Sequence, residues 1–206
     1  MIGVINYRTG NSQSVVFALN HLGLENRLVG TPEECADVER FILPGVGSAG
    51  VTMASLRDTG WDDYLAERVV REESPFLGIC VGLQVLFDWS DEHDTECLGW
   101  LPGRVRELDR SRVRVPHMGW NLVEPASGHP FVADITSGSH YYFVNSFYAT
   151  PDNSSDLAGT TEYDVRFASI VARRNIMATQ FHAEKSGPLG LRLLSRFASL
   201  TKDDLC

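Results

Sequence analysis

A cysteine between two glycines, at the end of an apolar run, constrains this chain more than any other feature. Residues 75–84 read PFLGICVGLQ, with Cys80 between Gly78 and Gly82. The apolar run predicts a buried strand, and the glycines allow the backbone to turn sharply into a helix. The sulfur at such a turn lies at a helix N-terminus, where unpaired N–H groups and the helix dipole favour the thiolate. The segment therefore predicts a strand, a nucleophile elbow and a helix, in that order.

A reactive cysteine needs a base, and a downstream histidine is the candidate. In residues 179–185, TQFHAEK, His182 and Glu184 stand two apart and alternate with apolar residues at the end of an expected strand. With Cys80 they match the nucleophile, base and orienting carboxylate of an acyl-transfer triad. Each residue also has a purely structural interpretation: Cys80 as a buried thiol, His182 as a core histidine and Glu184 as a surface charge. Only the fold can bring His182 to Cys80, because they lie far apart in the sequence.

Acyl transfer also needs N–H donors for the oxyanion of the tetrahedral intermediate. The Val81 N–H, directly after Cys80, is one candidate. The segment 44–47, Pro-Gly-Val-Gly, follows an expected strand and is flexible enough to bring the N–H of Val46 or Gly47 close to a substrate carbonyl. The alternative is an ordinary tight turn, which glycine-rich segments often form.

The composition indicates a globular domain and argues against several partners. The chain has 206 residues, 43% of them hydrophobic and 22% charged, so we expect a single domain over residues 1–206. A net charge of −9 without a Lys/Arg-rich run argues against nucleic-acid binding. The first apolar run ends at Asn6, too early for a signal sequence, and no stretch of about 18 apolar residues follows. We therefore expect a cytoplasmic protein that does not enter a membrane.

The cysteines are spaced unlike those of a zinc site or a disulfide framework. No C-x-x-C pair occurs, and the four positions are Cys35, Cys80, Cys97 and Cys206. This spacing favours reduced thiols in a cytoplasm, and we expect neither a metal nor another cofactor.

Strand-like and helix-like segments alternate through the first half of the chain, whereas strands dominate the second half. The expected order is strand 2–6, helix 15–22, strand 24–29, a capped helix start at 31–34, strand 40–43, helix 53–71 and strand 76–80. Strand-like segments then follow at 103–108, 112–115 and 141–144, with a hairpin of 165–171 and 175–181 and a final amphipathic helix at 189–200. We expect a three-layer α/β/α domain whose mostly parallel central sheet has an antiparallel extension in the second half.

Taken together, the motifs resemble the class I glutamine amidotransferases, whose glutaminase domains carry G-x-C-x-G, an upstream P-G-x-G loop and a late F-H-x-E. Further strings, typical of the HisH-type glutaminase subunits of imidazole glycerol phosphate synthase, are P-H-M-G-W-N at 116–121 and G-T-T-E-Y-D at 159–164. The ordered matches span the chain, at 10–11, 44–47, 78–84, 116–121, 142–144, 159–164 and 181–186.

The resemblance implies a flavodoxin-like fold and hydrolysis of L-glutamine to glutamate and ammonia. The ammonia would pass to a HisF-type cyclase partner, in a heterodimer, for synthesis of imidazole glycerol phosphate and AICAR in histidine biosynthesis. Cys80 would attack the side-chain amide, His182 would move protons and Glu184 would orient His182. The oxyanion donors would lie at Val46, Gly47 and Val81.

Further residues take their expected roles from the resemblance alone. The residues implied to contact the substrate are Gln84, Asn145, Ser146 and Phe147. The residues implied to lie at the partner surface are Asn11, Met118, Trp120 and Lys185.

Three departures from the family pattern leave the destination of the ammonia open. The chain has H-A-E at 182–184 where H-P-E is usual, V-N-S-F at 144–147 where V-H-[ST]-[YF] is common, and N-Y-R-T-G-N at 6–11 where D-Y-G-x-G-N is frequent. One alternative is a HisH-like paralogue that serves another synthase, such as a system that amidates sugars for surface polysaccharides. Others are a non-catalytic regulatory subunit and a cysteine hydrolase of the intracellular-protease type, which lacks the late F-H-x-E.

Overall fold

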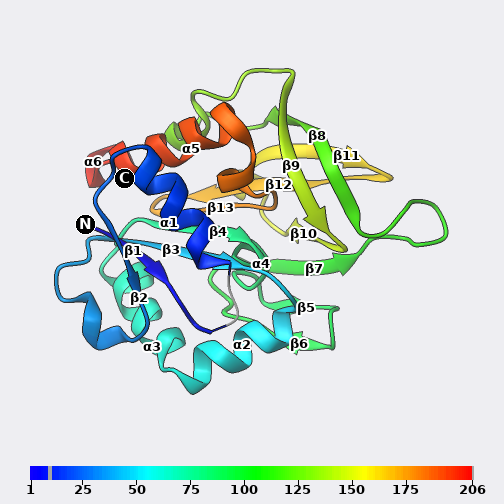
Figure 1. Ribbon diagram of the computed structural model, residues 1–206. Coiled ribbons are helices and arrows are strands. Elements are labelled where there is room, and N and C mark those ends of the chain that lie inside the picture. The colour runs from blue at the N-terminus through cyan, green and yellow to red at the C-terminus, as the bar shows by residue number, and fades with distance from the viewer. Residues whose placement is uncertain (9–10, 206) are drawn as a thin grey trace.

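The computed structural model describes residues 1–8 and 11–205 of the chain as one sheet with helices on both sides (Figure 1). Thr9 and Gly10, which belong to the N-Y-R-T-G-N segment, and Cys206, one of the four cysteines, lie outside the described residues. The strands are β1 (Ile2–Ile5), β2 (Asn26–Val29), β3 (Arg40–Gly45), β4 (Phe76–Cys80), β5 (Trp89–Ser90), β6 (Thr95–Glu96), β7 (Gly103–Glu107), β8 (His117–Pro125), β9 (Ser139–Asn145), β10 (Phe147–Pro151), β11 (Leu157–Tyr163), β12 (Val165–Arg173) and β13 (Ile176–Thr179).

Helices cover the two faces of the central strands. The α-helices are α1 (Ser12–His21), α2 (Ala49–Asp58), α3 (Trp61–Leu65), α4 (Val81–Gln84), α5 (Gly187–Ser199) and α6 (Lys202–Leu205). Shorter or irregular helical segments are η1 (Pro32–Cys35), η2 (Ala66–Arg71), η3 (Pro130–Val132), η4 (Ser154–Asp156) and η5 (Ala183–Lys185). α1 and α5 lie on one side of the sheet, and α2 and α3 lie on the other (Figure 1).

Parallel strands form the centre of the sheet, in the order β2-β1-β3-β4-β13. All residues of β4 and β13 are buried, as expected for strands that are covered by helices on both faces. The carboxyl ends of parallel strands meet at one edge, so the ends of β3 and β4 come together there. Gly45 at the end of β3 is the register partner of Cys80 at the end of β4.

The second half of the chain adds antiparallel strands. β12 pairs antiparallel with β13, and β10 and β7 continue the sheet beyond it. β11 connects β12 to β8, and β8 pairs along its length with β9, from His117 opposite Asn145 to Val123 opposite Ser139. The predicted three-layer α/β/α architecture with an antiparallel extension is confirmed.

Some of the local predictions are wrong. Thr31 makes no side-chain hydrogen bond that caps η1, so the capped helix start predicted at 31–34 is a short uncapped turn. Residues 112–115 form no strand, and the strand in this region is β8, which begins at His117. The single helix predicted over 53–71 is divided, because Thr59 and Gly60 separate α2 from α3. Gly60 has a φ of +72°, in the left-handed region that ends helices and that glycine adopts at little cost.

The turn after β4 is held against β3 at a distance that only glycine permits. A Cβ atom added to Gly82 would lie 2.0 Å from the carbonyl oxygen of Leu43, and one added to Gly78 would lie 2.4 Å from the carbonyl oxygen of Gly82. Cys80 itself has a φ of +57°, which costs free energy for a residue with a side chain. The glycines therefore let the strained elbow pack directly on the neighbouring strand.

We expect Gly82→Ala to lower the free energy of unfolding by about 1–3 kcal/mol, because the added methyl group overpacks the contact with β3. Urea denaturation followed by circular dichroism measures the change. Gly128→Ala is the matched control, since a Cβ at Gly128 meets no atom within 4 Å. Equal stability of the two variants would show that the elbow does not depend on this approach.

Candidate active site

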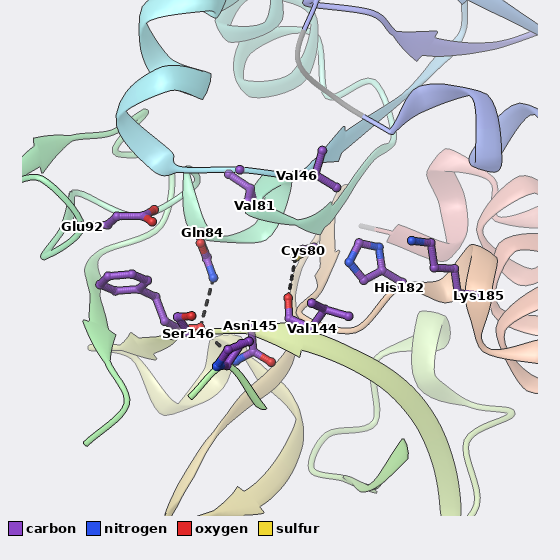
Figure 2. A pocket seen from close by; sticks show the side chains of 13 residues that line it. Val46, Cys80, Val81, Gln84, Glu92, Val144, Asn145, Ser146, His182 and Lys185 are labelled. Carbon is purple, nitrogen blue, oxygen red and sulfur yellow. Dashed lines mark hydrogen bonds between the residues drawn. The ribbon is translucent and has the colours of Figure 1, made fainter. Parts of the chain in front are cut away.

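All of the residues predicted to carry chemistry, except Glu184, line one cavity of about 330 Å³ at the carboxyl ends of β3 and β4 (Figure 2). Ligands commonly bind at this edge of open α/β sheets. The cavity is lined by Val46, Gly47, Cys80, Val81, Gln84, Glu92, Pro116, Val144, Asn145, Ser146, Phe147, His182 and Lys185. The structure therefore brings together residues that lie far apart in the sequence.

Cys80 is almost completely buried, and polar atoms surround its sulfur. The Sγ atom lies 3.8 Å from the carbonyl oxygen of Val144 on β9 and 3.9 Å from Nε2 of Gln180. The helix that follows, α4, has only four residues. Because the macrodipole is the sum of aligned peptide dipoles, its effect on the sulfur is smaller than the sequence suggested.

His182 lies beside Cys80 in the cavity (Figure 2). Glu184 contacts the Nδ1 atom of the His182 imidazole. The Nδ1 atom of His182 lies 2.9 Å from Oε1 of Glu184, and both side chains are buried. A carboxylate accepts only, so Nδ1 carries a proton and Nε2 is the nitrogen available to Cys80. Burial lowers the pKa of His182, but hydrogen bonds to Cys80 and Glu184 and the charges of these groups outweigh burial and raise it.

The backbone around His182 differs from the sequence prediction. β13 ends at Thr179, so His182 and Glu184 do not alternate at a strand end. His182 instead precedes the single turn η5, and its N–H donates to the carbonyl oxygen of Tyr142 on β9 at 2.9 Å. The hydroxyl of Ser186 donates to the carbonyl oxygen of His182 at 2.6 Å. Contacts with β9 and with its own turn thus position the imidazole.

The two candidate oxyanion segments meet at the elbow. Val46 and Gly47 follow β3, Val81 follows Cys80, and all three line the cavity. Gly47 has a φ of +96°, a conformation that glycine adopts readily, and a Cβ there would meet no atom within 4 Å. This loop is therefore next to the sulfur and unobstructed at Gly47.

Gln84 presents only its oxygen to the cavity. Its Nε2 donates to the carbonyl oxygen of Phe147 at 3.1 Å and to Oε1 of Gln180 at 3.2 Å, which uses both amide hydrogens. Asn145 also donates to the Phe147 carbonyl oxygen, at 3.0 Å. Asn145, one of the departures from the family pattern, thus helps to hold the segment between β9 and β10.

Sequence reasoning missed a carboxylate in the cavity. Glu92 lies between β5 and β6, and its Oε2 accepts a hydrogen bond from the N–H of Ala49, at the start of α2, at 2.7 Å. No motif surrounds Glu92, so no sequence signal could have indicated it. Gln180 was also missed, although it stands two residues before His182.

The predicted partner residues lie on the outer surface near the cavity. Met118 and Trp120 on β8 are exposed, and Lys185 lines the cavity. Asn11 lies at the N-terminal end of α1, where its Oδ1 accepts a hydrogen bond from the hydroxyl of Ser14. A groove of about 440 Å³ next to Lys185 is lined by Ser14, Phe17, Ala18, His21, Glu184, Lys185, Gly187 and Leu191. Exposed Phe17 on α1, which no prediction included, lies in this groove.

The other described thiols differ from Cys80. Burial raises the pKa of the Cys35 thiol to about 11 and that of the Cys97 thiol to about 12, so neither is a nucleophile near neutral pH. Within residues 1–8 and 11–205, no group of three or more His, Cys, Asp or Glu side chains is arranged to hold a metal. In the same part of the chain, no helix is long and apolar enough to cross a membrane.

The sequence matches one family over nearly its whole length. Residues 3–199 match the family described as glutamine amidotransferase class-I. A relative from Dehalococcoides mccartyi, named imidazole glycerol phosphate synthase subunit HisH, is 44% identical over 205 residues and covers 99% of both chains. Proteins of the same name from Chloroflexus aurantiacus and Neisseria meningitidis are 42% and 39% identical, covering 96% and 94% of this chain and 94% and 97% of their own.

Solved structures share the fold at lower sequence identity. A crystal structure described as glutamine amidotransferase superposes with a TM-score of 0.75 at 20% identity, covering 97% of this chain and 99% of its own. The structure of PurLQS from Thermotoga maritima also gives 0.75, at 17% identity, covering 95% of this chain and 96% of its own. At these identities the likeness concerns the fold alone.

We expect Glu184→Gln to lower the pKa of His182, because the substitution removes the buried negative charge that stabilises the imidazolium. An NMR pH titration of the imidazole resonances measures the change. Since the pKa of His182 is raised in the folded state, protonation stabilises the fold fully below the unfolded pKa of about 6.5. This contribution is lost as the pH rises through the raised value.

Glu162→Gln is the control, because Glu162 lies on β11 and lines a different cavity. The control should leave the titration of His182 unchanged. An unchanged pKa of His182 in Glu184→Gln would refute the electrostatic role of this carboxylate.

Proposed function

Because the chain belongs to the class I glutamine amidotransferases, we propose that it is the glutaminase subunit of an imidazole glycerol phosphate synthase. It hydrolyses L-glutamine to glutamate and ammonia, and the ammonia passes to a HisF-type cyclase that makes imidazole glycerol phosphate and AICAR in histidine biosynthesis. Relatives named HisH, 39–44% identical over nearly the full length of both chains, support this assignment. The observation that carries the proposal is Cys80 on a strained elbow, facing a buried His182–Glu184 pair in a cavity.

The proposed reaction proceeds in two acyl-transfer steps. The thiolate of Cys80 attacks the side-chain amide carbon of glutamine, and a tetrahedral oxyanion forms. His182 gives its Nε2 proton to the leaving nitrogen, the C–N bond breaks, and ammonia leaves a thioester on the sulfur. His182 then removes a proton from water, which attacks the thioester and releases glutamate and the thiolate. Glu184 keeps the imidazole in the required orientation throughout.

Backbone N–H groups of the elbow and of the glycine loop are proposed to bind the oxyanion. Val81 supplies one donor, and Val46 or Gly47 supplies the other. Both segments border the sulfur in the cavity, which supports this role. Each donor of this kind typically stabilises the transition state by about 2.7–4 kcal/mol.

The remaining polar groups of the cavity suit the amino-acid end of glutamine. The Glu92 carboxylate and the Gln84 oxygen are acceptors that match the α-ammonium group. The segment Asn145–Phe147 also lines the cavity, and we propose that it binds the α-carboxylate end of glutamine. The cavity volume lies at the lower end of the range of about 300–1,000 Å³ for small-molecule sites.

The cyclase is proposed to dock on the surface that runs from α1 to β8. Phe17, Met118 and Trp120 are 64%, 63% and 57% exposed, and aromatic and Met side chains are enriched at protein interfaces. The Trp120 ring would lie 3.9 Å from a Cβ atom added to Gly187, so it is next to this glycine. Gly187 lines the same groove as Phe17. Met118 lines a pocket with Pro116, and Pro116 also lines the catalytic cavity. The surface is thus continuous with the site that releases ammonia.

We place this heterodimer in the cytoplasm, whose reducing conditions suit the free thiols of Cys35, Cys80 and Cys97. The neighbouring genes would separate this assignment from a paralogue in a polysaccharide pathway. No comparison supports the paralogue.

We expect the purified chain alone to release little ammonia from glutamine and a HisF-type cyclase from the same organism to increase the rate by orders of magnitude. Cys80→Ala should abolish glutamine-dependent synthesis by the complex and leave ammonia-dependent synthesis intact, because only the glutaminase step uses the sulfur. A coupled assay of imidazole glycerol phosphate measures both activities. Loss of both would show that Cys80 is structural, and full activity without the cyclase would refute a regulated subunit.

We also expect Trp120→Ala to weaken binding to the cyclase about 30-fold, which corresponds to about 2 kcal/mol for a buried aromatic anchor. Isothermal titration calorimetry measures the dissociation constant. Val70→Ala is the matched control, since Val70 is an exposed apolar residue on η2 that lines neither the cavity nor the groove. Equal affinities of the two variants would exclude β8 from the interface.

A further inference from the structure

A buried amide that belongs to no triad contacts the reactive sulfur. Gln180 follows β13, and its side chain is completely buried. Its Nε2 lies 3.9 Å from Sγ of Cys80, within the range of hydrogen bonds to sulfur. Its backbone N–H donates to the carbonyl oxygen of Ser169 on β12 at 2.9 Å, which anchors the residue to the sheet.

The surrounding hydrogen bonds determine which end of the Gln180 amide faces the sulfur. Oε1 of Gln180 accepts from Nε2 of Gln84 at 3.2 Å. The orientation of Gln84 is set in turn by the carbonyl oxygen of Phe147, which can only accept. If the Gln180 amide were reversed, its NH₂ group would meet the NH₂ group of Gln84, and its oxygen would meet the sulfur. The N–H is therefore held toward Cys80.

The sulfur needs such a donor. The Val144 carbonyl oxygen, 3.8 Å away, is an acceptor and repels a negative sulfur, and α4 is too short for a large dipole. His182 is another polar group at the sulfur, and it must give up its proton during the proposed reaction. A fixed amide can stay hydrogen-bonded to the thiolate while His182 changes its protonation state.

We propose that Gln180 is a further catalytic residue, whose side-chain N–H stabilises the thiolate of Cys80 before attack and after release of glutamate. This role rests on the proposed glutaminase reaction. A hydrogen bond to the thiolate that lowers the pH midpoint of thiolate formation by about one unit increases the thiolate population about tenfold at a fixed pH below that midpoint. Without the hydrogen bond, about tenfold less thiolate is present, but each thiolate is about threefold more nucleophilic. The rate of attack therefore falls about threefold in total.

Substitution of Gln180 removes none of the other titratable groups near the sulfur. His182, Lys185 and Glu92 line the same cavity as Cys80, and Glu184 acts through His182. A change in the pH dependence of Cys80 in Gln180 variants can therefore be assigned to the amide when the fold is unchanged.

The test is the pH dependence of alkylation of Cys80 by iodoacetamide, quantified on the Cys80 peptide by mass spectrometry. The readout does not require glutamine hydrolysis, so it remains informative if the proposed function is wrong. We expect Gln180→Met to raise the pH midpoint of alkylation by about one unit, because the donor is lost. Gln180→Glu should raise it further, because a carboxylate adds a like charge and accepts only.

Two more variants separate catalysis from folding. Gln180→Asn keeps a buried amide, but the shorter side chain withdraws it from the sulfur. It should therefore raise the alkylation midpoint as Gln180→Met does, and it provides a test even if the other variants fold poorly. Asn175→Leu removes a buried amide just before β13, which donates to Val69 and Ser74 and does not contact Cys80. This control should lower the urea midpoint of unfolding and leave the alkylation midpoint unchanged. A wild-type alkylation midpoint in folded Gln180→Asn, or an equal shift in Asn175→Leu, would overturn the proposal.

Discussion

The contact between the elbow after β4 and the backbone of β3 is the constraint on which the site depends. Gly82 approaches the carbonyl oxygen of Leu43 so closely that any side chain would push the two segments apart. This contact holds Cys80 at a positive φ at the edge of the sheet, beside the loop 46–47. Strain in one residue is tolerated because buried parallel strands on both sides of β4 hold the backbone in place.

The sulfur connects two polar systems that come from different parts of the chain. One is the hydrogen-bonded His182–Glu184 pair, which we propose to supply and remove protons. The other is the series of amides that runs from Asn145 through the Phe147 carbonyl oxygen and Gln84 to Gln180. Because each amide uses its donors within the series, their orientations depend on one another. The same geometry leaves the oxygen of Gln84 free for a substrate.

β9 links the site to the proposed partner surface. Val144, whose carbonyl oxygen lies beside the sulfur, is the register partner of Met118 on β8, and Met118 is exposed on the outside of the molecule. In the proposed complex, one pair of strands therefore separates the cyclase from Cys80.

The sequence by itself determined the fold class and the elbow, because glycine spacing and apolar strands are local patterns with local physical causes. It also named Cys80, His182 and Glu184 as the candidate triad, but only the fold brings His182 to Cys80. It was wrong about 112–115 as a strand, about an unbroken helix over 53–71 and about His182 and Glu184 at a strand end. Gln180, Glu92 and Phe17 were missed, because a buried amide, a loop carboxylate and an exposed aromatic residue have no local signature. Only the tertiary structure decided where they lie and what they contact, since hydrogen-bond partners, cavities and exposure depend on which distant segments the fold brings together.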